Sequence, residues 1–105
     1  MARILEMATK SIIQNVELIG TNFQISVWNE LMKIPKGETR TYKDVAKAIG
    51  HPNSSRAVAN ACANNPHPII VPCHRVIRSD GALGGYSGVG GIKAKFRLLK
   101  RERAI

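Results

Sequence analysis

The sequence predicts a small, mainly α domain that contains a winged-helix-like helix-turn-helix and a short β element. One observation is the length, because 105 residues make a single domain. The others are apolar residues at helical spacing in several segments, with turn-forming residues between them. Hydrophobic residues make up 44% of the chain and charged residues 22%, a balance that argues against disorder.

The first clear helix is predicted to begin after Thr21, because Thr21 and Gln24 fit a capping box. Apolar residues then follow at helical spacing and are expected in the core: Phe23, Val27, Leu31 and Ile34. The turn-forming residues 35–37 are expected to end this helix. Residues 16–19, before it, fit a short strand or the end of a helix.

Two shorter helices with a tight turn predict the helix-turn-helix. The first is expected to begin at Thr41, which can cap it, and to end at Gly50. The second is expected to start at a cap among residues 53–55 and to continue through Ala63. Small residues cover nearly every face of this second helix, so it can approach either another surface or another helix closely.

The last third of the chain alternates between turns and short ordered segments. Residues 64–68 form a helix-terminating turn, and residues 69–71 are expected to be a short buried segment. Residues 81–91 form a glycine-rich loop. A basic helix is then predicted over residues 92–103, with an apolar inner face made of Ile92, Phe96 and Leu99.

The charge balance favours a polyanionic partner. Sixteen Lys and Arg against seven Asp and Glu give a net charge of +9 and an isoelectric point near 10.2. Nucleic acid and anionic membrane are the usual partners of such a surface, and a solvated basic surface is the alternative. No apolar run reaches transmembrane length and the N-terminus does not resemble a signal peptide, so we expect a soluble intracellular protein without membrane association.

The neighbouring residues Cys73 and His74 are the candidate reactive pair. A thiolate is the reactive form of cysteine and an imidazole nearby favours it, although a buried, inert cysteine fits the same pattern. Cys62 lies at core spacing in an alanine-rich helix, and we interpret it as structural. We expect no metal site from Cys73, His74 and His67, because the prolines around them extend the backbone and a fourth ligand is missing.

Residues 72–76, Pro-Cys-His-Arg-Val, resemble the active-site signature of the O6-alkylguanine-DNA alkyltransferases (methylated-DNA–protein-cysteine methyltransferases). Further segments resemble this family in its order: Gly20–Leu31, Ile34–Tyr42, Ser55–Val58, Asn65–Ile69, Gly85–Gly88 and Leu98–Glu102. Together they cover residues 18–103. The resemblance implies that residues 18–105 form the catalytic and DNA-binding domain, and that residues 1–17 are an N-terminal extension.

The resemblance also implies roles for the residues around the thiol. Cys73 is the alkyl acceptor, His74 takes the thiol proton through a water molecule, and Glu102 orients the imidazole. Tyr42 protonates or hydrogen-bonds the leaving guanine and crowds the adjacent phosphate. Asn65 braces the turn between the recognition helix and the cysteine segment.

Two further groups of residues are implied by the resemblance. The DNA-binding group consists of Tyr42 and four residues of the recognition helix: Ser55, Arg56, Ala57 and Asn60. Among them, Arg56 enters the base stack in place of the extruded base. The second group forms the substrate pocket and has five residues: Trp28, Pro68, Val76, Tyr86 and Ser87. Within the pocket, the Ser87 backbone and the carbonyls of Val76 and Cys73 read the guanine edge.

The function that the resemblance implies is DNA repair by direct, irreversible and stoichiometric alkyl transfer to Cys73 after base flipping. It implies double-stranded DNA containing O6-alkylguanine as the partner, no cofactor, a monomer, and a location in the cytoplasm and nucleoid or in the nucleus. Two alternatives stay open. One is an alkyltransferase-like protein that binds the lesion and recruits other factors, although such proteins have another residue, often Trp, at the position of Cys73. The other is a helix-turn-helix regulator.

Overall fold

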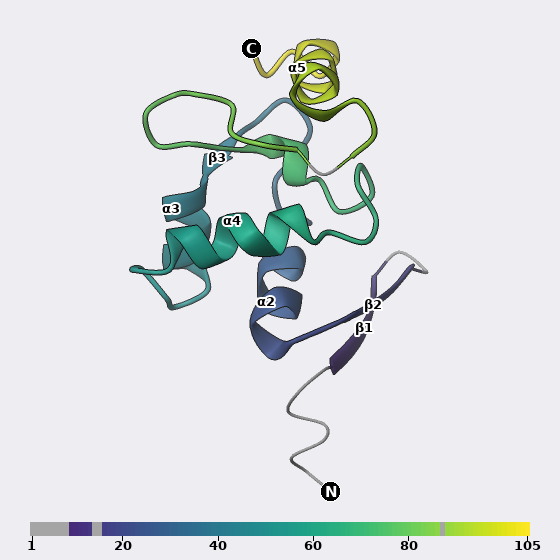
Figure 1. Ribbon diagram of the computed structural model, residues 1–105, viewed down its shortest axis with the longest axis vertical. Coiled ribbons are helices and arrows are strands. Elements are labelled where there is room, and N and C mark those ends of the chain that lie inside the picture. The colour runs from purple at the N-terminus through teal and green to yellow at the C-terminus, as the bar shows by residue number, and fades with distance from the viewer. Residues whose placement is uncertain (1–8, 14–15, 87) are drawn as a thin grey trace, which may run out of the picture.

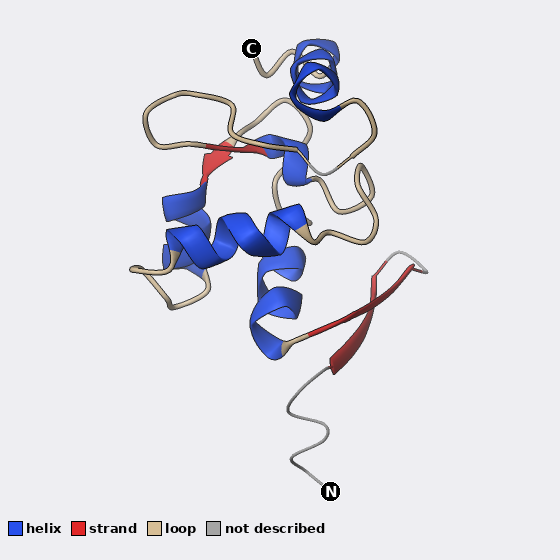
Figure 2. Cartoon of the chain, viewed as in Figure 1, coloured by secondary structure: helices blue, strands red, loops and turns tan. Residues whose placement is uncertain are grey.

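The computed structural model of the chain describes residues 9–13, 16–86 and 88–105. Most of the ordered structure is helical, as predicted (Figure 2). The helices are α2 (Asn22–Leu31), α3 (Tyr42–Ala48), α4 (Ser55–Ala63), the 3-10 turn η1 (Cys73–Arg75) and α5 (Gly91–Arg101). The strands are β1 (Thr9–Ile13), β2 (Val16–Gly20), β3 (Arg40–Thr41) and β4 (Val76–Ile77).

The helices α2, α3 and α4 form the body of the domain. Figure 1 shows α5 at one end of the molecule and the β1–β2 hairpin at the other, beside α2. The described core lies between α2, α3, α4 and η1 and includes Trp28, Leu31, Val45, Val58 and Val76. The strands β1 and β2 pair antiparallel, so residues 16–19 are part of a strand and not the end of a helix.

The first helix, α2, begins as predicted and ends earlier than predicted. The Thr21 hydroxyl accepts from the Gln24 backbone N–H at 3.1 Å, and the Gln24 side chain accepts from the Thr21 N–H at 3.0 Å, which completes the capping box. The helix ends at Leu31, one turn before the expected stop at residues 35–37. Ile34 lies beyond the helix, yet it is buried, because tight turns closed by hydrogen bonds from Lys33 to Glu30 and from Ile34 to Leu31 fold this segment back onto the core.

The predicted helix-turn-helix is present as α3 and α4. Thr41 caps α3 in a capping box with Asp44, and Gly50 ends it with a φ of +81°, a conformation that glycine adopts without strain. Ser54 is the residue before α4, but its side chain makes no capping hydrogen bond. The Trp28 indole N–H donates to the Ala61 carbonyl at 2.9 Å and thereby fixes α4 against α2.

Some small residues of α4 are buried in the core and others are exposed. Ala61 is buried against the core, where a small side chain allows the close approach of α2. Ala57, one turn before Ala61, is exposed, as are its neighbours Arg56 and Asn60. Small residues of α4 thus lie both at the contact with another helix and at the surface, so both explanations for the alanine-rich composition apply.

The prediction that residues 69–71 form a buried segment is wrong for two of the three residues. Ile69 and Ile70 are 60% and 43% exposed, and only Val71 is buried. Ile69 has a φ of +81°, and the Val71 N–H donates to the His67 carbonyl at 2.9 Å. The segment is thus a tight turn, and its curvature directs one side chain inward instead of three.

The inner face predicted for the last helix is also largely wrong. The helix α5 ends at Arg101, and of the three apolar residues expected inside only Leu99 is buried; Ile92 is 53% and Phe96 46% exposed. The inward position belongs to Lys95, one turn before Leu99, which is fully buried. Lys95 can lie there because its ammonium group donates to backbone carbonyls, which offset the cost of burying a charge.

A second, parallel strand pair positions the functional segment. In it, β3 and β4 pair in register Arg40 with Val76 and Thr41 with Ile77. This pairing brings the start of α3 next to the residues that follow η1. None of the described helices is long and apolar enough to cross a bilayer.

Candidate active site

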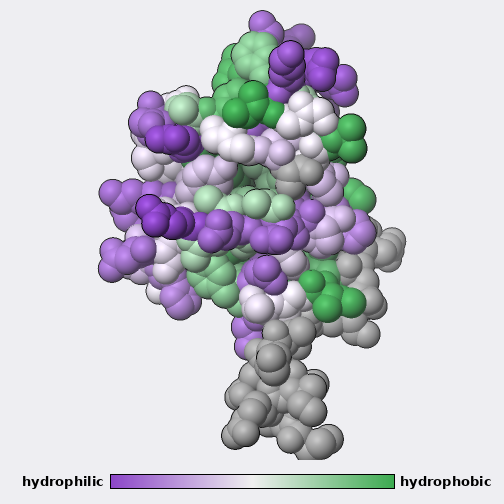
Figure 3. Space-filling view, viewed as in Figure 1, coloured by the Kyte–Doolittle hydropathy of each residue, from purple (hydrophilic) through white to green (hydrophobic). Residues whose placement is uncertain are grey.

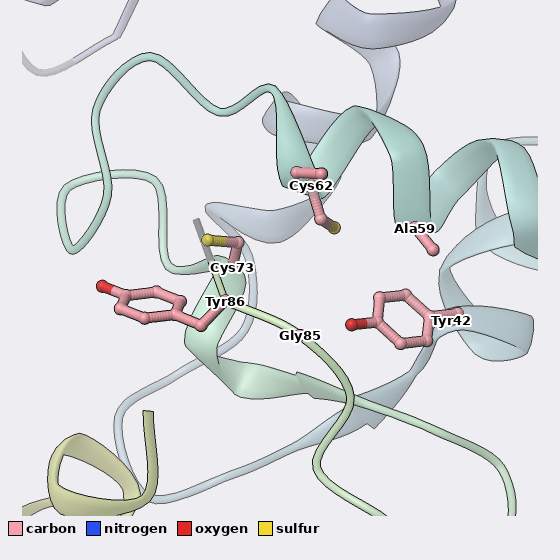
Figure 4. A pocket seen from close by; sticks show the side chains of 7 residues that line it. Tyr42, Ala59, Cys62, Cys73, Gly85 and Tyr86 are labelled. Carbon is pink, nitrogen blue, oxygen red and sulfur yellow. The ribbon is translucent and has the colours of Figure 1, made fainter. Parts of the chain in front are cut away.

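A cavity of about 220 Å³ lies between α3, α4, η1 and the glycine-rich loop. Seven residues line it: Tyr42, Ala59, Cys62, Ala63, Cys73, Gly85 and Tyr86. Figure 4 shows the two tyrosine rings on opposite sides of the cavity, with the two cysteine side chains between them. The cavity is mainly apolar, as small-molecule pockets usually are.

The Cys73 thiol is held in the wall of this cavity by the short turn η1. Cys73 is the first residue of η1 and is only 3% exposed. Its backbone N–H donates to the Val71 carbonyl at 2.8 Å, and the Arg75 N–H donates to the Pro72 carbonyl at 3.0 Å. These bonds fix the backbone on both sides of the thiol.

Behind the thiol, His74, Arg75 and Glu102 form one network. The His74 Nε2 atom lies 3.0 Å from Glu102 Oε2, in a ring that is fully buried. Arg75 donates to both carboxylate oxygens, at 3.0 and 2.8 Å, and also to the Ile34 carbonyl at 2.8 Å. The hydrogen bonds from Arg75, followed by those from His74, lower the pKa of Glu102 from 4.5 to about 2. Glu102 is therefore a carboxylate at neutral pH.

The ionised Glu102 determines which nitrogen of His74 can act as a base. A carboxylate can only accept hydrogen bonds, so Nε2 of His74 carries the hydrogen. Burial lowers the pKa of His74 more than Glu102 raises it, and the ring is neutral at pH 7. The remaining lone pair is on Nδ1, which is buried and has no hydrogen-bond partner in the described part of the chain. This nitrogen is available to take a proton.

The two tyrosines of the cavity have different surroundings. Burial raises the pKa of Tyr42 to about 12, so its hydroxyl remains a hydrogen-bond donor throughout the physiological range. A Cβ at Gly84 would lie 2.8 Å from this hydroxyl, which shows how closely the glycine-rich loop covers Tyr42. The Tyr86 ring meets His74 edge to face, with 6.4 Å between ring centroids. Tyr86 thus brings the glycine-rich loop into contact with the imidazole.

Asn65 forms hydrogen bonds across the segment between α4 and η1. Its side-chain amide donates to the Val71 carbonyl at 2.7 Å and accepts from the His67 N–H at 2.9 Å. Asn65 is 7% exposed, so both bonds lie away from bulk water. The side chain thus spans the tight turn that leads to Cys73.

The structure brings the predicted pocket residues together only in part. Tyr86 lines the cavity, and Pro68 lines an adjoining cleft of about 390 Å³ that shares Tyr86. Trp28 does not line the cavity, because it lies in the core with its N–H bonded to α4. The Val76 carbonyl accepts from Lys95 at 2.6 Å. Ser87 lies outside the described residues.

The predicted DNA-binding residues share the outer face of α4. All four are exposed: Ser55, Arg56, Ala57 and Asn60. Figure 3 shows hydrophilic residues across the part of the surface that α4 occupies. Tyr42, at the start of α3, lines both the thiol cavity and a second groove, which Ser55 and Arg56 of this face also line.

Lys95 and Cys62 are two residues of the site that the sequence analysis missed. Lys95 donates to the carbonyls of Val76 and Gly85, at 2.6 and 3.1 Å, and so connects β4 to the glycine-rich loop. Burial lowers its pKa to about 8. The sequence offers no signal for it, since Lys95 is one of several cations in a basic helix.

Cys62 is buried as predicted, but it also lines the cavity. Burial raises its pKa to about 12, so its thiol is protonated at neutral pH and is a poor nucleophile. A signal for its position existed, because Ala59, Cys62 and Ala63 share one side of a helix. Among the described residues, no three His, Cys, Asp or Glu side chains are placed to hold a metal ion.

The fold and the site together define a helix-turn-helix domain that carries a buried thiol, an imidazole and a carboxylate beside a cavity. Residues 22–104 match the family model described as 6-O-methylguanine DNA methyltransferase, DNA binding domain. The chain therefore belongs to the 6-O-methylguanine DNA methyltransferase family.

Individual proteins of known identity are similar to this chain. A methylated-DNA–protein-cysteine methyltransferase of Methanosarcina acetivorans is 58% identical over 83 residues, which are 79% of this chain and 52% of that protein. The crystal structure of Mycobacterium tuberculosis OGT in complex with DNA has a TM-score of 0.77 at 52% identity, over 81% of this chain and 51% of that one.

A third similar structure is that of S. pombe Atl1 in complex with damaged DNA containing O6-carboxymethylguanine. Its TM-score is 0.62 at 30% identity, over 76% of this chain and 74% of that one. This chain thus spans about half the length of the two methyltransferases and a larger share of Atl1.

Proposed function

We propose that this chain repairs O6-alkylguanine in DNA by transferring the alkyl group to Cys73. The observation that carries the proposal is the Cys73 thiol in a cavity wall, next to a neutral His74 that is oriented by an ionised Glu102. A thiol of this kind needs a base to become a nucleophile, and the base needs a fixed tautomer. The residues of this network supply both.

In the proposed reaction, His74 Nδ1 takes the thiol proton through a water molecule. The Cys73 sulfur then attacks the alkyl carbon, and a carbon–sulfur bond forms as the bond from carbon to guanine O6 breaks. The electron pair of the broken bond remains on guanine, and the Tyr42 hydroxyl donates its proton to the base as this charge develops. The proton taken up by His74 then returns to Tyr42 through solvent, so the thiol proton is in effect delivered to guanine. Guanine is restored and the protein keeps a thioether, so each molecule reacts once and needs no cofactor.

The exposed face of α4 can bind the duplex while the damaged base is flipped into the cavity. Chemistry on a base in a duplex requires flipping it out of the stack, at a cost of a few kcal/mol. We infer that Arg56 enters the vacated stack and that Ser55, Ala57 and Asn60 contact the duplex around it. The net charge of +9 supplies affinity for phosphates that does not depend on sequence.

The arrangement of the whole protein is part of the proposal. We assign residues 18–105 to the alkyltransferase domain and residues 1–17 to an N-terminal extension. The protein acts as a monomer in the compartment that holds DNA, which is the cytoplasm and nucleoid or the nucleus. Asn65 keeps the cysteine segment in place, and the Val76 carbonyl and the Ser87 backbone read the guanine edge.

The comparisons support alkyl transfer from lesions in DNA to the protein, because the similar proteins are named as methyltransferases and one is crystallised with DNA. A lesion-binding protein without transfer activity is the alternative, and the similarity to Atl1 is the observation that favours it. The Cys73 thiol at the cavity favours transfer, since a protein that only binds the lesion has no need of an activated thiol there.

A repair assay with matched cysteine variants tests the proposal. A duplex containing one O6-methylguanine is incubated with excess protein, and restored guanine is measured by nucleoside analysis. Wild type and Cys62→Ser should both restore guanine to completion, whereas Cys73→Ser should restore none and should still bind the duplex. Binding by wild type without any restored guanine would establish the lesion-binding alternative instead.

A further inference from the structure

A second, more polar groove lies at the mouth of the thiol cavity. Its volume is about 520 Å³, and Tyr42, Ala59 and Gly85 line both the groove and the cavity. The two spaces are therefore adjacent, with the thiol at the inner one. Under the proposed function the flipped base occupies the inner space, so the groove receives the sugar-phosphate backbone that remains attached to that base.

Two arginines from different elements line this groove. Arg56 comes from the exposed face of α4, and Arg78 directly follows β4. The serine next to each arginine lines the groove as well: Ser55 and Ser79. Guanidinium and hydroxyl donors are the groups that bind phosphate oxygens, and arginine can do so in a bidentate manner.

The backbone holds Arg78 at the groove through a tight turn. The Arg78 N–H donates to the Ala82 carbonyl at 2.9 Å, and the Gly81 N–H donates to the Arg78 carbonyl at 3.1 Å. Within this turn Asp80 accepts from the Ala82 N–H at 3.0 Å through Oδ1. The position of Arg78 is thus set by main-chain bonds that do not involve its side chain.

The Arg78 side chain is paired with Asp80 in a way that permits exchange. Its Nη2 atom lies 2.8 Å from Asp80 Oδ2, and the two side chains are 60% and 56% exposed. Exposed ion pairs of this kind contribute little to stability. A phosphodiester can therefore replace the Asp80 carboxylate at little cost, while the other carboxylate oxygen continues to hold the turn.

We propose that Arg78 binds a backbone phosphate of the flipped nucleotide, and that Asp80 occupies the guanidinium group until DNA displaces it. Arg56 and Arg78 then hold the DNA strand from the two sides of the groove. The Asp80 carboxylate, left beside a phosphate, opposes binding through like-charge repulsion. This inference rests on the proposed function for the identity of the bound strand.

The salt dependence of binding to undamaged duplex DNA tests the inference. Fluorescence anisotropy gives the dissociation constant of the full chain from about 50 to 200 mM salt, where each lost phosphate contact lowers the log–log slope by about 1. Arg78→Gln should lower the slope by about 1 and weaken binding several-fold. Arg97→Gln, which removes the same charge from the exposed face of α5, should change neither quantity by a comparable amount.

Asp80→Asn provides a test with the opposite sign. Asparagine keeps the oxygen that accepts from the Ala82 N–H and removes the charge that pairs with Arg78. It should therefore strengthen binding to DNA. The inference is overturned if Arg78→Gln behaves as Arg97→Gln does, or if Asp80→Asn weakens binding, because the ion pair would then serve only to order the loop.

A comparison of substrates separates this inference from the proposed function. Arg78→Gln should slow alkyl transfer from the duplex more than transfer from free O6-methylguanine base, which carries no phosphate. If wild type transfers no alkyl group but Arg78→Gln still lowers the salt slope, the proposed function fails and the phosphate site stands. If transfer proceeds and the two arginine variants have equal slopes, only the phosphate site fails.

Discussion

Replacing Glu102 with glutamine should destabilise the fold because it removes the carboxylate at the centre of the buried network. Arg75 donates to both oxygens of Glu102, and His74 lies 3.0 Å from one of them. Glutamine keeps one acceptor oxygen and places an amide N–H₂ against a donor of Arg75 or His74. The substitution therefore removes an ion pair and creates a donor–donor contact at a side chain that is only 9% exposed.

The depressed pKa of Glu102 sets the magnitude of this effect. A pKa that falls from 4.5 to about 2 on folding corresponds to about 3 kcal/mol of stability at neutral pH, as an order of magnitude. This stabilisation is complete well above pH 4.5, where the unfolded chain is also ionised, and it is lost as the pH falls through the folded-state value. At pH 3 about half of it remains.

Urea denaturation of wild type and Glu102→Gln at pH 7 and pH 3 measures this difference. We expect a deficit of about 3 kcal/mol at pH 7 that becomes markedly smaller at pH 3, with equal m-values. Asp80→Asn is the matched control, because its ion pair with Arg78 has the same 2.8 Å distance but is exposed. Equal deficits for the two variants, or a Glu102→Gln deficit that does not depend on pH, would refute the reasoning.

Three further predictions concern transfer. Gly84→Ala should slow alkyl transfer and lower the melting temperature, because the new Cβ would lie 2.8 Å from the Tyr42 hydroxyl. Gly81→Ala is the control, because Gly81 also has a positive φ but has open space around it. The difference in transfer rate and melting temperature between the two variants therefore measures the effect of the clash with Tyr42. The rate of alkyl transfer from free O6-methylguanine should fall at acidic pH with a midpoint below 6.5, since burial lowers the pKa of His74; a midpoint above 6.5 would contradict this. Arg56→Ala should slow repair of a duplex lesion by on the order of 1–3 kcal/mol in activation free energy and affect the free base far less, whereas His74→Ala should slow both. Similar losses for both variants on both substrates would refute this division of roles.

The sequence predicts most of the helical framework because the signals for helix ends are local. Thr21 with Gln24 and the cap at Thr41 are recognised within four residues of sequence, and both begin helices in the structure. Gly50 ends α3 for an equally local reason, its positive φ. The mainly α fold with its helix-turn-helix follows from these signals.

The parts that sequence reasoning missed depend on contacts between distant segments. Lys95 is buried instead of Ile92 and Phe96 because carbonyls of β4 and of the glycine-rich loop accept from its ammonium group. Neither carbonyl is recognisable from the composition of α5. The same holds for the partnership of Arg75 with Glu102, which lie at opposite ends of the segment that contains the loop. The β3–β4 pairing was likewise not predicted, since two-residue strands have no periodicity to detect.

Mass spectrometry can show whether the Cys73 sulfur accepts the alkyl group. The protein is incubated with limiting amounts of a duplex containing O6-methylguanine, and its intact mass and peptide masses are then measured. We expect a gain of one methylene mass per protein molecule, in proportion to the lesion supplied and confined to the peptide that contains Cys73. An unchanged mass after lesion binding, or the same gain on the peptide that contains Cys62, would contradict it.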